Sequence, residues 1–167
     1  MAYSERGYPY PDGDSAIDPA RVDTGQPGGS GAITARVAVF SQDASTLRVL
    51  MVERGADRFP GCWALPGGCV GVGQDVLRAA GCGLALETGL SFETLEYVGA
   101  YTDLNARRTA FAYTIWAHGT PHPTSGAGVR WIHVAQLRNG TRPAALGHLR
   151  IIHDAVAVIR ARGYGPA

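Results

Sequence analysis

Two runs rich in aliphatic and β-branched residues follow the first thirty positions of the chain. They read ITARVAVF and LRVLMVER, and the polar stretch SQDAST lies between them. This pattern predicts a strand, a turn and a second strand. The later runs LEYVGAYTD, TAFAYTIWAHG and VRWIHVAQL have the same β-rich composition, so we expect them to complete a mixed sheet.

Two further segments repeat apolar residues at helical spacing. Residues 73 to 89 carry one such stripe, formed by Val76, Leu77, Ala80 and Leu84, and Gly89 follows the expected end. The stretch AALGHLRIIHDAVAVIRARG near the end of the chain carries another, formed by Leu149, Ile152, Val156 and Ile159. We expect His148 and His153 to cap this second helix or to face solvent rather than to bind a ligand.

Glycine inside the first of these helices needs an explanation. Gly81 and Gly83 each cost roughly 1 kcal/mol relative to alanine at such a position. A requirement other than local helix stability must therefore account for them.

The composition is that of an ordinary globular protein, with 46% hydrophobic and 17% charged residues. The formal net charge of +1 gives no electrostatic reason to expect a nucleic acid or a membrane as partner. We expect a cytoplasmic protein with one domain over residues 31–163 and a C-terminal tail over 164–167. Residues 1–30 should form a flexible tail, because Gly, Pro, Asp and Ser dominate this segment.

The stretch from Trp63 to Leu90, WALPGGCVGVGQDVLRAAGCGLALETGL, resembles the box of the Nudix hydrolase family, G-x5-E-x7-R-E-U-x-E-E-x-G-U, where U is aliphatic. Its first glycine aligns with Gly68, its last acid with Glu87 and its closing glycine with Gly89. The resemblance covers about residues 32 to 163, and the flanking segments look like the ADP-ribose pyrophosphatase-like branch. It implies an α/β fold, an α/β/α sandwich with a mixed central sheet.

The remaining acidic positions of the box are replaced. Gln74 and Cys82 stand where the family has an ion-paired Glu and Arg, and Gly83 and Leu86 stand where it has two more carboxylates. In the family, three carboxylates at positions i, i+3 and i+4 of the helix hold a divalent metal against a pyrophosphate. Hard cations need several oxygen ligands, so we expect neither a metal nor another cofactor at this site.

Three classes of function remain open. The first is a metal-independent acid/base enzyme that acts on a small organic molecule, for example in specialised metabolism. The second is a pseudoenzyme that binds an ADP-ribose-like nucleotide without cleaving it, and the third is a residual Nudix pyrophosphohydrolase. Loss of the acids predicts a neutral and more apolar site, which favours the first class. Tyr3, Tyr8 and Tyr10 could anchor the N-terminal tail to the domain or to a second copy, so a homodimer is one expected partner arrangement.

Glu87 is the strongest catalytic candidate, because a carboxylate in an apolar environment has a raised pKa that suits proton transfer near neutrality. Asp103 and Tyr101 are candidates for a second acid and a hydrogen-bond donor, and their alternative roles are a turn-forming Asp and a core-edge Tyr. The candidate ligand-binding residues lie in the glycine loop or carry a charge: Gly68, Cys69, Arg54 and Arg107. The alternative for the two arginines is that they lie in solvated loops.

Overall fold

The computed structural model describes residues 32–54, 61–104, 106–119, 121–124, 128–145 and 147–166; the predicted flexible tail lies outside these residues. They form one sheet of seven strands and three helices. The strands are β1 (Ala32–Asp43), β2 (Thr46–Glu53), β3 (Trp63–Ala64), β4 (Gly67–Cys69), β5 (Glu96–Asp103), β6 (Arg108–Trp116) and β7 (Val129–His133). The helices are α1 (Val76–Thr88), α2 (Val134–Arg138) and α3 (His148–Ala161).

Strand β1 is the centre of the sheet and has a different neighbour along each half of one edge. Its residues 34–36 pair with β4 and its residues 40–43 pair with β2, both antiparallel. On its other edge β1 pairs in parallel with β6, which in turn pairs antiparallel with β5. The sheet is therefore mixed, as the sequence predicts, and β2 and β4 part from each other beside the middle of β1.

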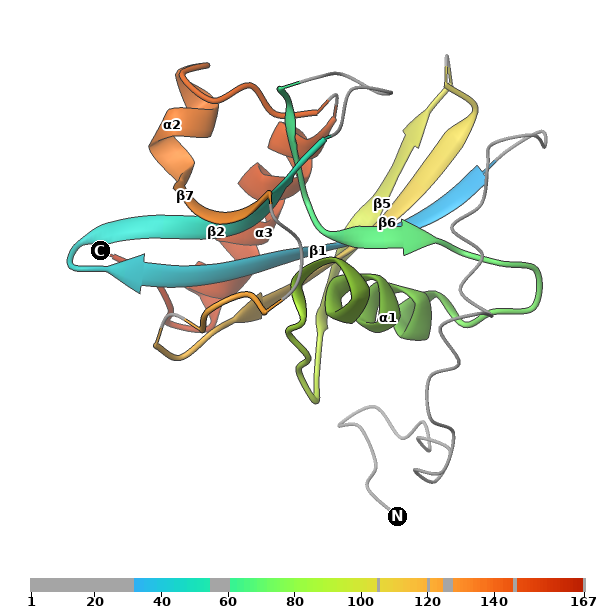
Figure 1. Ribbon diagram of the computed structural model, residues 1–167, viewed down its shortest axis with the longest axis horizontal. Helices are drawn as coiled ribbons and strands as arrows, with labels where there is room; N and C mark the ends of the chain where they lie inside the picture. The colour runs from blue at the N-terminus through green and yellow to red at the C-terminus, as the bar shows by residue number, and fades with distance from the viewer. Residues whose placement is uncertain are drawn as a thin grey trace.

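Helices cover both faces of this sheet, α1 on one and α3 with α2 on the other (Figure 1). Phe40, Met51 and Ile152 belong to the core under α3, and Val37 and Leu84 belong to the core under α1. Alternate β1 residues enter the two cores because successive side chains of a strand point to opposite faces. The α/β/α sandwich predicted from the resemblance is confirmed.

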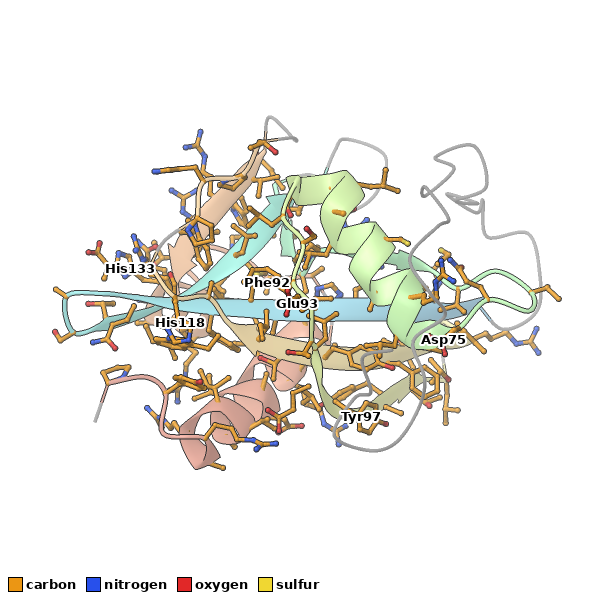
Figure 2. The ribbon with its side chains drawn as sticks, turned by 90° about the horizontal axis from the view of Figure 1, so that it is seen from below. Asp75, Phe92, Glu93, Tyr97, His118 and His133 are labelled. Carbon is orange, nitrogen blue, oxygen red and sulfur yellow. The ribbon has the colours of Figure 1, made fainter. Side chains whose placement is uncertain are left out.

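Helix α1 begins at Val76, the first residue of its apolar stripe and three residues later than the start predicted at residue 73. Asp75 caps it by accepting a 2.9 Å hydrogen bond from the backbone N–H of Arg78, and Figure 2 shows Asp75 at this end of the helix. Gly89 ends the helix at φ 73°, a left-handed conformation that favours glycine.

Gly83 is the point of closest approach between α1 and β4. A Cβ atom at this position would lie 2.4 Å from the carbonyl carbon of Gly67 and 2.7 Å from the backbone nitrogen of Gly68. A Cβ on Gly81 would meet no atom within 4 Å. Gly83 is thus required by packing, whereas no contact of this kind accounts for Gly81.

The end of the described chain packs against the sheet. The ring of Tyr164 stacks on Trp116, with 5.4 Å between the ring centroids and 8° between the ring planes. In the described part of the chain, no helix has the length and apolar character needed to cross a membrane.

Candidate functional site

Three polar side chains from three different elements bond to the backbone of Leu65–Gly67, which follows β3 and ends with the first residue of β4. The N–H of Leu65 donates to Nδ1 of His148 over 2.9 Å, and its carbonyl oxygen accepts from Nη1 of Arg36 over 3.5 Å. The N–H of Gly67 donates to Oε2 of Glu87 over 2.9 Å. Together with Arg54, which acts on these groups electrostatically, Arg36, Glu87 and His148 are called the LPG cluster below.

The sheet register explains why Arg36 reaches this segment. Arg36 pairs with Gly67 on one side and with Ala112 on the other. Its side chain lies on the same face as Ala38 and Phe40, which pack under α3. The two small partners leave room for the guanidinium, so Arg36 occupies the α3 face just where β2 and β4 part.

His148 and Glu87 are brought to the same place by the ends of their helices. His148 is the first residue of α3, and Trp63 holds the preceding segment through hydrogen bonds with Pro143 and Ala145 of 2.8 and 2.7 Å. Glu87 lies in the last turn of α1, four residues after Gly83 and therefore on the same helix face. The contact of Gly83 with Gly67 thus also sets the distance between the Glu87 carboxylate and the Gly67 N–H, from which it accepts a hydrogen bond.

Burial raises the pKa of the Glu87 carboxyl group above its ordinary value. The hydrogen bond from Gly67 and the charges of Arg36 and Arg54 act in the opposite direction but do not cancel this effect. The direction of the shift agrees with the sequence-based prediction, but the charges of Arg36 and Arg54 are present where that prediction expected apolar surroundings.

The basic members of the cluster shift the other way. Burial, with a smaller contribution from Arg54, lowers the pKa of Arg36 to about 10, so Arg36 stays charged at neutral pH. Burial and the charges of Arg36 and Arg54 lower the pKa of His148 to about 3, so its imidazole is neutral.

The charge balance of the cluster differs from the sequence-based expectation of a neutral and apolar site. Arg54 and Arg108 both act on Arg36 as like charges, and among the described residues Glu87 is the one carboxylate whose charge acts on it. Excess positive charge in a partly buried place favours an anionic ligand. The sequence pattern of the box missed this because the arginines come from strands outside it.

The ligand-binding candidates fall into two groups. Arg54 belongs to the LPG cluster, and Gly68 and Cys69 lie in β4, paired with Ala35 and Thr34 of β1. Cys69 acts electrostatically on Arg36, which places it beside the cluster. Arg107, by contrast, is exposed in the turn between β5 and β6 at φ 51°.

Tyr101 and Asp103, the other two catalytic candidates, are engaged elsewhere. The hydroxyl of Tyr101 donates to Oδ2 of Asp154 in α3 over 2.8 Å, and burial and this bond raise the pKa of the phenol. Oδ1 of Asp103 accepts from the N–H of Ala106 over 3.0 Å within the β5–β6 turn. These bonds tie Tyr101 to α3 and Asp103 to its own turn; their part in catalysis remains a prediction.

Sequence reasoning did not single out Arg36, and it expected His148 to cap α3 or to face solvent, whereas the side chain is partly buried and bonded to Leu65. Its predicted lack of a ligand-binding role is untested. The signal for Arg36 was present, because a lone arginine interrupts the apolar run ITARVAVF at a position facing the same way as Ala38 and Phe40. His148 gave no comparable signal, since its partner Leu65 is 83 residues away in the chain.

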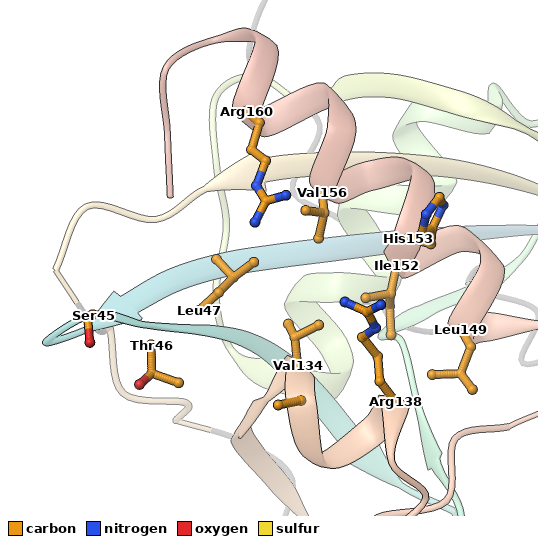
Figure 3. A pocket seen from close by; sticks show the side chains of 11 residues that line it. Ser45, Thr46, Leu47, Val134, Arg138, Leu149, Ile152, His153, Val156 and Arg160 are labelled. Carbon is orange, nitrogen blue, oxygen red and sulfur yellow. The ribbon is translucent and has the colours of Figure 1, made fainter. Parts of the chain in front are cut away.

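A cavity of about 430 Å³ opens on another part of the surface, between the β1–β2 turn, α2 and α3 (Figure 3). Its floor is apolar, with Leu47 and Ile152, and Arg138 and Arg160 extend over it. None of its lining residues belongs to the LPG cluster, so its existence does not bear on Glu87.

A search against protein-family models matches the NUDIX domain over residues 32–155. The chain belongs to the Nudix family. Among solved structures, the NUDIX domain of Shewanella oneidensis NrtR complexed with ADP ribose is 21% identical to this Nudix domain, with a TM-score of 0.67, over 78% of this chain and 90% of that one. None of the curated proteins matches the sequence.

Two other structures match as well. A MutT/nudix family protein from Enterococcus faecalis is 19% identical over 80% of this chain, with a TM-score of 0.67, and NrtR complexed with a 27mer DNA is 22% identical over 78%, with a TM-score of 0.61. In both cases the match spans 63% of the other protein. At these identities the likeness supports the fold.

Proposed function

We propose that this Nudix domain is a metal-independent enzyme that acts on a small organic molecule, with Glu87 as its acid or base. The observation that carries the proposal is the state of Glu87: partly buried, with a raised pKa and one oxygen bonded to Gly67. Because Oε2 accepts the Gly67 N–H, a proton exchanged with a ligand would reside on Oε1. A carboxyl group whose pKa lies closer to neutrality is better suited to proton transfer.

The residues at the metal-binding positions of the box do not fit a divalent cation. A carboxylate side chain at position 83 has no space, because even a Cβ atom would lie 2.4 Å from the Gly67 backbone. Leu86, at the second position, is 44% exposed and offers no oxygen. Arg36 and Arg54 would repel a cation placed beside Glu87. These observations support a reaction that does not depend on metal.

A second candidate function rests on the positive charge of the cluster. Arg36, Arg54 and Arg108 could offset the charge of a diphosphate without metal, and one of the similar structures is a NUDIX domain complexed with ADP ribose. On this view the Nudix domain binds an ADP-ribose-like nucleotide and does not cleave it. A residual pyrophosphohydrolase is the third possibility, which the experiment below separates from the other two.

The test is turnover with and without metal. The protein is incubated with ADP-ribose, NADH and nucleoside triphosphates, and separately with a cell metabolite extract, in Mg²⁺ and in EDTA, and products are followed by mass spectrometry. We expect no Mg²⁺-dependent diphosphate cleavage, and consumption of a metabolite in EDTA. Mg²⁺-dependent cleavage at about 1 per second or faster would overturn the proposal, and binding of ADP-ribose without any turnover would favour the second candidate.

Glu87→Gln is the decisive variant, because it keeps the shape of the side chain and removes the proton. Turnover in EDTA should fall by roughly a hundredfold or more. Glu93→Gln is the matched control, since Glu93 is exposed in the segment that follows α1 (Figure 2). Equal turnover in the two variants would remove Glu87 from the mechanism.

A further inference from the structure

Arg36 and His148 are linked through the main chain of a single residue. Arg36 donates to the carbonyl oxygen of Leu65, and the N–H of Leu65 donates to His148. One side chain comes from the central strand and the other from the start of α3, so Leu65 fixes two elements of the fold relative to each other. Neither side chain takes part in the proton transfer proposed for Glu87.

The hydrogen bond to Leu65 determines the tautomer of His148. A backbone N–H can only donate, so Nδ1 of His148 must carry a lone pair and the ring proton must be on Nε2. Burial opposes a second proton on the ring, and so do the charges of Arg36, from β1, and of Arg54, which follows β2. His148 therefore presents Nε2–H as a hydrogen-bond donor without carrying a charge.

Arg36 is poorly satisfied within the described part of the chain. Its one hydrogen bond there is the 3.5 Å contact with Leu65, at the long limit for such a bond, although a guanidinium has five N–H donors. None of the ion pairs between described residues involves Arg36, and Glu87 acts on it only at longer range. A partly buried guanidinium in this condition is stabilised when an anion supplies acceptors.

We infer that the LPG cluster is a receptor for a single oxyanion, a carboxylate or a phosphate-like group of the ligand, held by the guanidinium of Arg36 and the Nε2–H of neutral His148. Arg54 adds charge, and Glu87 is left to exchange a proton with the rest of the ligand. The location of this anion site rests on the proposed function, because the proposed function takes the LPG cluster as the ligand site. The binding step itself does not depend on whether Glu87 transfers a proton.

Two probes test this inference, sulfate for a phosphate-like group and acetate for a carboxylate. Each is titrated into the ¹⁵N-labelled full chain while the amide signals of Leu65 and Gly67 are followed by NMR. We expect a saturable shift of both signals with at least one probe, and the probe that binds identifies the class of anion. Absence of a saturable shift with both probes overturns the inference.

Matched variants separate binding from folding. Arg36→Gln should weaken binding of the effective probe roughly tenfold or more, whereas Arg78→Gln, at an exposed position of α1, should leave it unchanged. His148→Asn keeps an acceptor near Nδ1 for Leu65 and removes the distal donor, so it should fold and yet bind the probe several-fold more weakly. Unchanged affinity in Arg36→Gln or in folded His148→Asn contradicts the inference.

Two further readouts distinguish it from the proposed function. Long-range ¹H–¹⁵N spectra should show His148 protonated at Nε2 alone between about pH 5.5 and 8; a titration near pH 6.5 would contradict the assigned state. Glu87→Gln should bind sulfate or acetate at least as well as the native chain, because it removes a like charge. A Glu87→Gln variant that keeps its turnover would refute the acid/base role and leave the oxyanion receptor intact.

Discussion

Replacing Gly83 by alanine should destabilise the protein, although alanine is the better helix former. The substitution gains about 1 kcal/mol of helix propensity. However, its Cβ would lie 2.4 Å from the carbonyl carbon of Gly67, a backbone atom that cannot rotate away. Contacts of this kind are relieved near 3.5 Å or more, so α1 and β4 must separate by about 1 Å. Overpacking typically costs about 1–3 kcal/mol, and a clash with backbone atoms belongs at the upper end, about 3 kcal/mol. Less the gain of about 1 kcal/mol in helix propensity, we expect a net loss of about 2 kcal/mol.

Gly81→Ala is the matched control, two residues away in the same helix. Its Cβ meets nothing within 4 Å, so it should stabilise the protein by about 0.5–1 kcal/mol. Urea unfolding of both variants should show equal m values and a difference of about 3 kcal/mol, which corresponds to melting temperatures about 6–12 °C apart. If Gly83→Ala proves as stable as Gly81→Ala, the packing explanation of Gly83 fails, and with it the argument that no carboxylate fits there.

Three other predictions concern pH and the hydrogen bonds of the site. Because the pKa of Glu87 is raised in the folded chain, the native protein keeps a proton that the unfolded chain releases above pH 4.5, and the free energy of unfolding falls as the pH rises from 4.5 through the folded pKa. Urea unfolding of Glu87→Gln should lack this decline, and Glu93→Gln should retain it. His148 has the opposite effect, because its folded pKa of about 3 means that stability is lost as the pH falls from 6.5 towards 3. His148→Asn should therefore flatten the stability profile between pH 6.5 and about 3, and an unchanged slope would refute this prediction. Tyr101→Phe removes the hydrogen bond to Asp154 and should lower the free energy of unfolding by about 1 kcal/mol without changing turnover. A large fall in turnover would instead indicate that Tyr101 takes part in catalysis.

The order of the elements and the fold could be predicted from the sequence, because they depend on local pattern. The β-rich runs became β1, β2, β5, β6 and β7, and the apolar stripes became α1 and α3. The second half of VRWIHVAQL was predicted as strand but forms the helix α2. The Nudix box also identified Glu87 and the direction of its pKa shift, since one carboxylate remained on an otherwise apolar helix face. These inferences needed only spacing along a single element and the chemistry of its side chains.

The surroundings of Glu87 were decided by tertiary structure alone. Arg36 and His148 lie far apart in the chain and meet only because Leu65–Gly67 bonds to β1, α1 and α3 at once. Tertiary packing also brings Tyr101 to Asp154, 53 residues later in the chain, and the close contact of Gly83 with β4 explains why glycine is needed at that position. Local pattern cannot encode these long-range contacts, since each depends on how separate elements pack. The sequence therefore predicted a neutral site, whereas packing places Arg36 and Arg54 near Glu87.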